Sequence, residues 1–226
     1  MNYLAPLTDM FTKSKLMILD FARIPADLPD DENIQLFFDE QTNQGNNPRL
    51  PEHRQVFNND MLSATNARYL VSQYGEDRSA TLAGSVIAKE SRTLHMGVDI
   101  FSKDLETVYA PCDGEIIRAA YEEQDHGYGH YVIFKPNEAD FYFFFGHLSK
   151  DLPALAAVKA GQPIASLGDY HEQENGGWTR HLHLQICKDL PAESETPIGY
   201  STKDSFAENS QKFPNPFDYF PEWKVL

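Results

Sequence analysis

From about residue 80 onward, short apolar runs alternate with clusters of Gly, Pro and Asp. Runs of this length that are rich in Val, Ile, Phe and Tyr and bounded by turn residues are typical of β-strands. The pattern predicts a mainly β domain, with strands at residues 86–88, 98–101, 107–109, 114–121, 131–135, 141–146, 163–167 and 181–187. A single helical turn is expected at residues 152–157.

One apolar run, FYFFF at residues 141–145, is uninterrupted by polar positions. It could serve as a stacking platform for a ligand. A strand that is buried on both faces also reads as a continuous apolar run, and we favour this interpretation.

The N-terminal part of the chain is less regular. An apolar segment at residues 15–22 precedes a polar stretch at 26–55, which we interpret as loop with a short strand or helix at 34–38. Spaced apolar residues within 58–74 favour a helix.

We therefore divide the chain into three parts. Residues 1–79 form a partly irregular extension, which either covers a cleft or completes the fold. Residues 80–190 form the main domain. Residues 191–226, rich in Pro, Ser, Phe and Tyr, are expected to be an irregular tail that packs its aromatic side chains on that domain.

Composition narrows the possible partners. The 226 residues include 34 acidic and 19 basic side chains, a net charge of −15, which argues against a nucleic-acid partner. No apolar run is long enough to cross a membrane and no leader pattern is visible, so a cytoplasmic location is expected. Cys112 and Cys187 are expected to be separate thiols rather than a disulfide. The oligomeric state cannot be inferred from these features.

Two short motifs carry candidate chemistry. His95 and Asp99 lie in HMGVD, and His181 and His183 lie in RHLHLQ. Side chains two apart on a strand share a face, so both histidines of the second motif should project together. Gly97 suggests a bend or a close backbone approach that lets the first pair converge. Imidazole and carboxylate are zinc ligands, and a catalytic zinc needs only three protein ligands, which leaves one histidine for proton transfer.

Six segments follow one another along the chain, and the first and the last contain the two motifs: HMGVDIF, VYAPCDGEI, GYGHYVIFKP, FYFFFGHLS, KAGQPIASLGD and NGGWTRHLHLQI. This series resembles the lysostaphin/LytM-type zinc metallopeptidases over about residues 92–187. The run YGEDR at 74–78 and the NGGW before HLH are similar to a subgroup that also occurs in multidomain proteins. The resemblance implies an antiparallel β-sheet catalytic domain that binds zinc and acts on peptidoglycan peptides.

The resemblance also implies roles for individual residues. His95, Asp99 and His183 match the zinc ligands, His181 matches the catalytic histidine, and His147 of GHLS matches an assisting histidine. The chain has no HExxH motif, so a histidine must act as general acid and base, and an imidazole suits both directions of proton transfer.

The sequence departs from the common pattern at Gln185, where a glutamate is usual. We expect Gln185 to lie behind the zinc ligands and to affect their orientation. Trp178 and Arg180, beside the HLH strand, are candidate substrate contacts, the first lining a cleft and the second binding a carboxylate. His130 is expected to be structural, His126 and His171 to lie in loops, and His53 to have no chemical role.

Three functions remain open. The first is a zinc-dependent peptidase that hydrolyses a peptide amide bond, in peptidoglycan or in a muropeptide. The second is a catalytically inactive peptide-binding module of the same fold, and the third an amidase for a small metabolite. The presence of all five expected active-site residues favours the enzyme.

Overall fold

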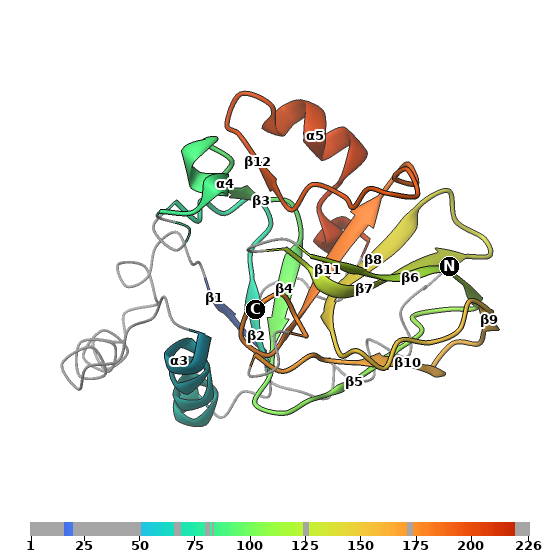
Figure 1. Ribbon diagram of the computed structural model, residues 1–226, viewed down its shortest axis with the longest axis horizontal. Helices are drawn as coiled ribbons and strands as arrows, with labels where there is room; N and C mark the ends of the chain where they lie inside the picture. Colours follow the sequence, from blue (N-terminus) through green and yellow to red (C-terminus); the bar gives the residue numbers. More distant parts are fainter. Residues whose placement is uncertain are drawn as a thin grey trace.

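The computed structural model describes residues 16–19, 51–65, 69–79, 82, 84–123, 127–170 and 174–219. The largest sheet has the strand order β1-β2-β4-β11-β8-β7-β6-β9, and its pairs are antiparallel except for β1 with β2 (Figure 1). The described part of the chain is thus mainly β with few helices, as the sequence predicted. None of its helices is long and apolar enough to cross a membrane.

The centre of the sheet is β11 (His181–Cys187), which pairs with β4 (Val98–Phe101) on one side and β8 (Tyr142–Leu148) on the other. All residues of β11 are buried. Leu182, Leu184 and Ile186 pack in the main hydrophobic core, so alternate residues point to the opposite face. The strand therefore presents its histidines on the face away from this core.

Strand β8 is buried on both faces, as its sequence predicted. Phe143 and Phe145 pack in the main core, whereas Phe144 packs in a separate cluster with Tyr128 and Tyr131. The FYFFF run is therefore core on both sides and not an exposed stacking platform.

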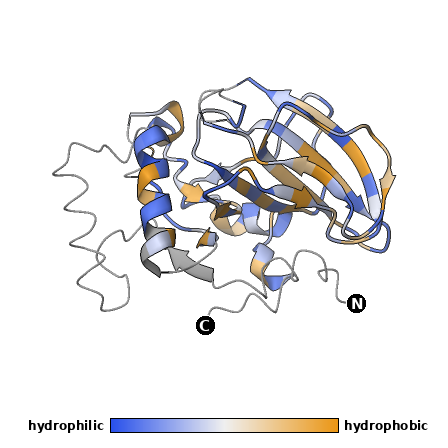
Figure 2. Ribbon diagram, turned by 90° about the horizontal axis from the view of Figure 1, so that it is seen from below, coloured by the Kyte–Doolittle hydropathy of each residue, from blue (hydrophilic) through white to orange (hydrophobic). Residues whose placement is uncertain are grey.

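The rest of the sheet continues through β7 (Gly129–Pro136), β6 (Gly114–Glu122) and the short β9 (Ala157–Val158). A two-stranded sheet of β5 (Thr107–Tyr109) and β10 (Pro163–Ser166) supplies Val108, Ile164 and Ala165 to the main core. Figure 2 shows the hydrophobic residues concentrated along the strands.

The N-terminal part joins the sheet directly. Helix α3 (Pro51–Thr65) is followed by β2 (Tyr69–Ser72), which pairs with β4, and β1 (Leu16–Leu19) pairs with β2 in parallel. The helix expected within 58–74 exists, but it begins earlier, and its second half is replaced by β2 because Tyr69, Leu70 and Val71 are buried in the sheet. The element expected at 34–38 lies outside the described residues.

Two further expectations are wrong. Residues 86–88 belong to the short helix α4 (Val86–Lys89), because the Ser85 side chain caps its first turn by accepting from Ala88 N at 3.1 Å. Residues 152–157 form no helical turn, and Ala157 instead pairs with Glu115 of β6.

The tail is more regular than expected within its described part, which ends at residue 219. It contains β12 (Tyr200–Ser201), helix α5 (Phe206–Lys212) and the 3-10 helix η1 (Pro216–Asp218). β12 pairs with β3 (Leu94–His95), which the alternating pattern alone did not reveal because each strand has only two residues.

Candidate metal centre

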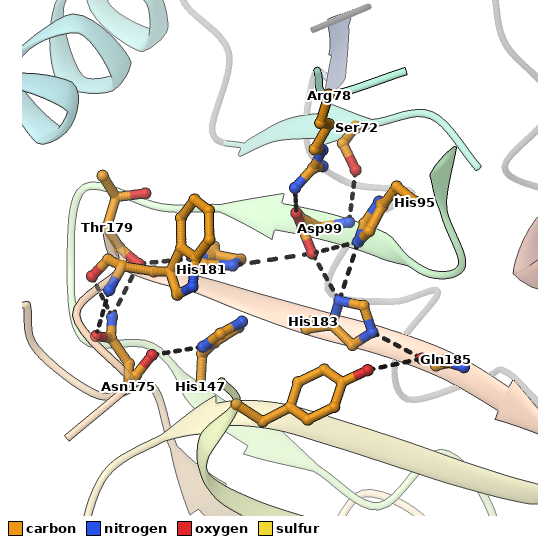
Figure 3. A network of polar contacts seen from close by, with 12 residues as sticks. Ser72, Arg78, His95, Asp99, His147, Asn175, Thr179, His181, His183 and Gln185 are labelled. Carbon is orange, nitrogen blue, oxygen red and sulfur yellow. Dashed lines mark hydrogen bonds and ion pairs between the residues drawn. The ribbon is translucent and has the colours of Figure 1, made fainter. Parts of the chain in front are cut away.

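Four short strands converge on one buried cluster of polar side chains. His95 comes from β3, Asp99 from β4, and His181 and His183 from β11, while His147 comes from the end of β8. All five side chains are buried, between 1% and 5% exposed. Figure 3 shows these side chains facing one another. The structure thus brings together every residue that the sequence assigned to metal binding or proton transfer.

Three atoms at the centre of this cluster have the spacing of metal ligands. His95 Nε2 lies 3.2 Å from His183 Nδ1 and 3.5 Å from Asp99 Oδ1, and His183 Nδ1 lies 3.0 Å from that oxygen. Tetrahedral zinc with ligand bonds of about 2.0–2.2 Å places its ligand atoms roughly 3.3 Å apart. His95, Asp99 and His183 are also a group whose ligand atoms all lie within 4.8 Å of one another. The three side chains therefore fit a zinc ion.

The protonation pattern of His183 supports this fit. Its Nε2 lies 3.0 Å from Gln185 Oε1, and the amide orientation is fixed because Gln185 Nε2 donates to Ile198 O at 3.2 Å. In the neutral imidazole, His183 Nε2 then carries the proton, and Nδ1 has a free lone pair that can bind a metal ion. Gln185 thus lies behind a candidate ligand, as expected from the sequence.

His181 Nδ1 lies 2.6 Å from Thr179 O, and His147 Nδ1 lies 2.5 Å from Asn175 O. Because carbonyl oxygens only accept, both histidines carry a proton on Nδ1 and a free lone pair on Nε2. His181 Nε2 lies 3.8 Å from Asp99 Oδ1, and the rings of His181 and His147 are 4.3 Å apart. Both histidines therefore present a basic nitrogen at the candidate metal centre.

One loop holds both of these histidines. Asn175 is fully buried, and its side chain donates to Thr179 O at 2.9 Å and accepts from Trp178 N at 3.0 Å. The loop thus folds so that the carbonyls of Asn175 and Thr179, four residues apart, each face one of the two histidines. His147 itself has a left-handed backbone with φ of 61°, which is uncommon outside glycine and is found at sites where function requires an unusual side-chain direction.

Burial controls the protonation of the cluster. Burial lowers the pKa of His181 to about 4, although the charge of Asp99 acts in the opposite direction. Burial and the neighbouring His181 together hold the pKa of His147 well below its usual value. Burial alone would raise the pKa of Asp99, but Arg78, His95 and His181 outweigh it and keep this pKa well below its usual range. Neutral imidazoles thus surround an ionised carboxylate, as metal binding requires.

A cavity of about 210 Å³ opens onto the cluster. It is lined by the candidate ligands, by His147 and His181, and by side chains of the surrounding loops, among them Trp178, Arg92 and Tyr200. Trp178 therefore lies where the sequence placed it. Arg180 is not among the lining residues, because its guanidinium pairs with Asp169 at 3.1 Å and donates to Lys103 O at 2.7 Å.

The remaining histidines lie elsewhere. His130 Nδ1 lies 3.0 Å from Glu174 O, a contact that joins β7 to the loop before β11, and His53 lies on α3. His126 and His171 lie outside the described residues. Cys112 and Cys187 are separate free thiols, as expected, and Cys187 is buried on the histidine face of β11 beyond Gln185.

The structure adds residues to which the sequence assigned no role. Arg78 Nη1 contacts Asp99 Oδ2 at 2.6 Å, and Tyr128 Oη donates to Gln185 Oε1 at 3.2 Å. Arg78 is the last residue of the YGEDR run. From the sequence, this run was notable only for its similarity to a subgroup of the lysostaphin/LytM-type family. The available signal was an acidic residue two positions before an arginine, but surface ion pairs have the same spacing.

A buried His, Asp and His set with two further basic histidines beside a cavity is typical of metal-dependent hydrolases. Residues 93–197, a little under half of the chain, match the model of Peptidase family M23. The match confirms the resemblance to lysostaphin/LytM-type peptidases. A comparison with curated proteins gave no match.

Solved structures similar to this chain include three bacterial proteins. The catalytic domain of the antimicrobial peptidase lysostaphin from Staphylococcus simulans is 27% identical, with a TM-score of 0.38 over 51% of this chain and 80% of that chain. A zinc-containing peptidase from Vibrio cholerae is 28% identical, with a TM-score of 0.34, and the match covers 46% of this chain and 28% of that chain. A mutant catalytic domain of the M23 protein EnpA from Enterococcus faecalis is 20% identical, with a TM-score of 0.37, and the match covers 50% of this chain and 78% of that chain.

Proposed function

We propose that this protein is a zinc-dependent peptidase that hydrolyses a peptide amide bond, in peptidoglycan or in a muropeptide derived from it. The observation that carries the proposal is the convergence of His95 Nε2, Asp99 Oδ1 and His183 Nδ1 within 3.5 Å of one another. The match of residues 93–197 to the model of Peptidase family M23 supports the reaction class.

His95, Asp99 and His183 would hold the zinc ion. A bound zinc activates water at neutral pH and polarises the scissile carbonyl. Asp99 can offer only Oδ1 because Arg78 occupies Oδ2. Three protein ligands that line a cavity would suit a catalytic zinc, which keeps one position for water, rather than a structural zinc with four protein ligands.

His181 is the general acid and base in this proposal. Its Nδ1 proton is held by Thr179 O, so Nε2 is the atom that takes a proton from the attacking water and gives it to the leaving amine. The pKa of His181, lowered to about 4 chiefly by burial, keeps this nitrogen unprotonated before the reaction begins.

His147 assists from the adjacent position. Its ring lies 4.3 Å from that of His181, and its Nδ1 is held by Asn175 O. With its Nδ1 proton held by Asn175 O, His147 Nε2 is a second basic nitrogen, which would accept a hydrogen bond from the attacking water and share in its proton transfer. Trp178 lines the same cavity with its ring 6.3 Å from His147, and it would pack against the peptide beside the scissile bond.

Metal analysis of the purified protein, paired with a hydrolysis assay, tests the proposal. We expect about one zinc per chain, loss of zinc in His95→Ala and Asp99→Ala, and release of amines from peptidoglycan or muropeptides by the wild-type protein. His53→Ala, on α3, is the matched control and should retain zinc.

Folded wild-type protein without zinc would overturn the proposal. Zinc binding together with peptide binding but no turnover would instead identify an inactive binding module. Turnover restricted to small amides would identify a metabolite amidase.

A further inference from the structure

A buried ion pair lies directly behind the candidate metal centre. Arg78 is 5% exposed, and its guanidinium contacts Asp99 through Nη1 at 2.6 Å and Glu76 Oε1 through Nη2 at 2.6 Å and Nε at 2.7 Å. Glu76 is 6% exposed. The forked guanidinium group of Arg78 thus binds two buried carboxylates at once, an arrangement for which arginine is better suited than lysine.

This contact decides which oxygen of Asp99 faces the metal position. Oδ2 is occupied by Arg78, and Oδ1 lies toward the candidate ligands, 3.0 Å from His183 Nδ1. The backbone of Asp99 is also fixed, because its N–H donates to Ser72 Oγ at 2.7 Å. Asp99 is therefore held at both ends before any metal binds.

The same segment positions His95 through its backbone. Gly75 N donates to His95 O at 2.8 Å, and His95 N donates to Glu76 O at 3.0 Å. The backbone of residues 74–78 thus bonds to β3, which carries His95. The side chain of Arg78, the last of these residues, contacts Asp99. Figure 3 shows Arg78 and His95 approaching Asp99 from different sides.

Helix α5 fixes this segment from outside. Gly75 has a left-handed φ of 75°, and a Cβ there would lie 2.8 Å from the ring of Phe206. Tyr74 Oη donates to Phe213 O at 2.6 Å. The positions of residues 74–78 are therefore set by the sheet on one side and by the tail on the other.

We propose that residues 74–78 are a ligand-positioning segment, in which Arg78 and Glu76 hold Asp99 and thereby set the zinc affinity of the site. This inference rests on the proposed function and adds to it. The segment precedes residues 93–197, so the family match does not include it.

Charge repulsion between Arg78 and a zinc ion would act in the opposite direction. Glu76 offsets it, because the Arg78 and Glu76 pair is neutral and the carboxylate of Asp99 lies between Arg78 and the metal position. Loss of outer partners of metal ligands typically reduces metal affinity by about 10- to 100-fold. We therefore expect positioning to outweigh repulsion.

The experiment measures the zinc dissociation constant by competition with a chromophoric chelator, and the absorption spectrum of the cobalt-substituted protein. Arg78→Met should raise the zinc dissociation constant by about 10- to 100-fold and change the cobalt spectrum. Arg118→Met is the matched control, since Arg118 donates to Ala192 O and Pro191 O away from the centre. It should remain within twofold of wild type.

Two variants keep the test decisive if Arg78→Met does not fold. Arg78→Lys preserves the buried charge but not the fork, and Glu76→Gln removes the charge that holds the fork. Both should weaken zinc binding in a protein whose circular dichroism is unchanged. Unchanged or tighter zinc binding in the folded variants would overturn the inference, whereas zinc-free wild-type protein would overturn the proposed function itself.

Discussion

Gly97 lies directly against the imidazole of His183. A Cβ added to Gly97 would come within 2.4 Å of His183 Cε1 and 2.6 Å of Nε2, closer than any real contact. The added Cβ would also lie only 2.9 Å from Leu184 O, so it could not move away from the ring toward that carbonyl. The absence of a side chain between His95 and Asp99 is therefore what allows the third candidate ligand to reach them.

Gly97→Ala should consequently weaken zinc binding. The added methyl group displaces the His183 ring, so we expect at least a tenfold increase in the zinc dissociation constant, in the range for disturbed metal ligands. Chelator competition measures it. Gly84→Asn is the control: Gly84 has a left-handed φ of 92°, which Asn tolerates better than most residues, and a Cβ there would meet nothing within 4 Å, so the variant should bind zinc as wild type does. Equal zinc binding by Gly97→Ala would show that the ring has room to move.

His181→Ala should separate metal binding from turnover. Because His181 is not one of the three candidate ligands, the variant should retain about one zinc per chain while turnover falls by about 10²- to 10⁴-fold. Metal content and single-turnover rates measure the two effects. Retained turnover in His181→Ala, with loss in His147→Ala, would assign the proton transfer to His147.

Gln185→Met should disturb His183 without touching the metal position. The variant keeps the volume of the side chain but removes the oxygen that lies 3.0 Å from His183 Nε2. We expect zinc affinity to fall by about 10- to 100-fold. Isothermal titration with zinc checks the result, and Cys187→Ala, further along the same face of β11, should leave zinc affinity near that of wild type. An unchanged affinity in Gln185→Met would remove the orienting role of this amide.

The metal-free protein should lose stability as the pH falls below neutrality. The pKa values of His147 and His181 are lowered in the folded protein, chiefly by burial. The unfolded chain therefore binds more protons, so their contribution is complete above about pH 6.5 and is lost as the pH falls toward the folded values. Each histidine contributes a slope of at most about 1.4 kcal/mol per pH unit.

Thermal unfolding of the metal-free protein between pH 7.5 and pH 5 measures this effect. His147→Ala should show a shallower loss of stability than wild type, whereas His53→Ala should match it. A slope that is the same in wild type and His147→Ala would contradict the assigned protonation states.

The sequence predicted the central strands and the candidate ligands because both depend on local spacing. β4 and β11 are buried strands whose apolar residues and turn boundaries are legible, and two histidines two apart on a strand must share a face. The six motifs in order then specified the family. Gly97 also behaved as expected, because a glycine between two polar candidates indicates close approach.

Other features depend on contacts that spacing does not encode. α4 was predicted as a strand because Val86, Ile87 and Ala88 suit either structure, and the Ser85 cap decides between them. The pairing of β3 with β12 joins residues about a hundred positions apart. Arg180 looked available for a carboxylate, but Asp169, eleven residues before it, already occupies its guanidinium.

The pairing of β2 with β4 has a consequence for any attempt to isolate the domain. β4 has β11 on one side and β2 on the other, so a chain shortened to residues 93–197 would leave one side of β4 with unpaired N–H and C=O groups. A strand edge of that kind, carrying Val98 and Ile100, recruits strands from other molecules and promotes aggregation. β2 in turn pairs with β1, so the smallest unit suited to recombinant work begins no later than Leu16 and keeps β1, α3 and β2 in place.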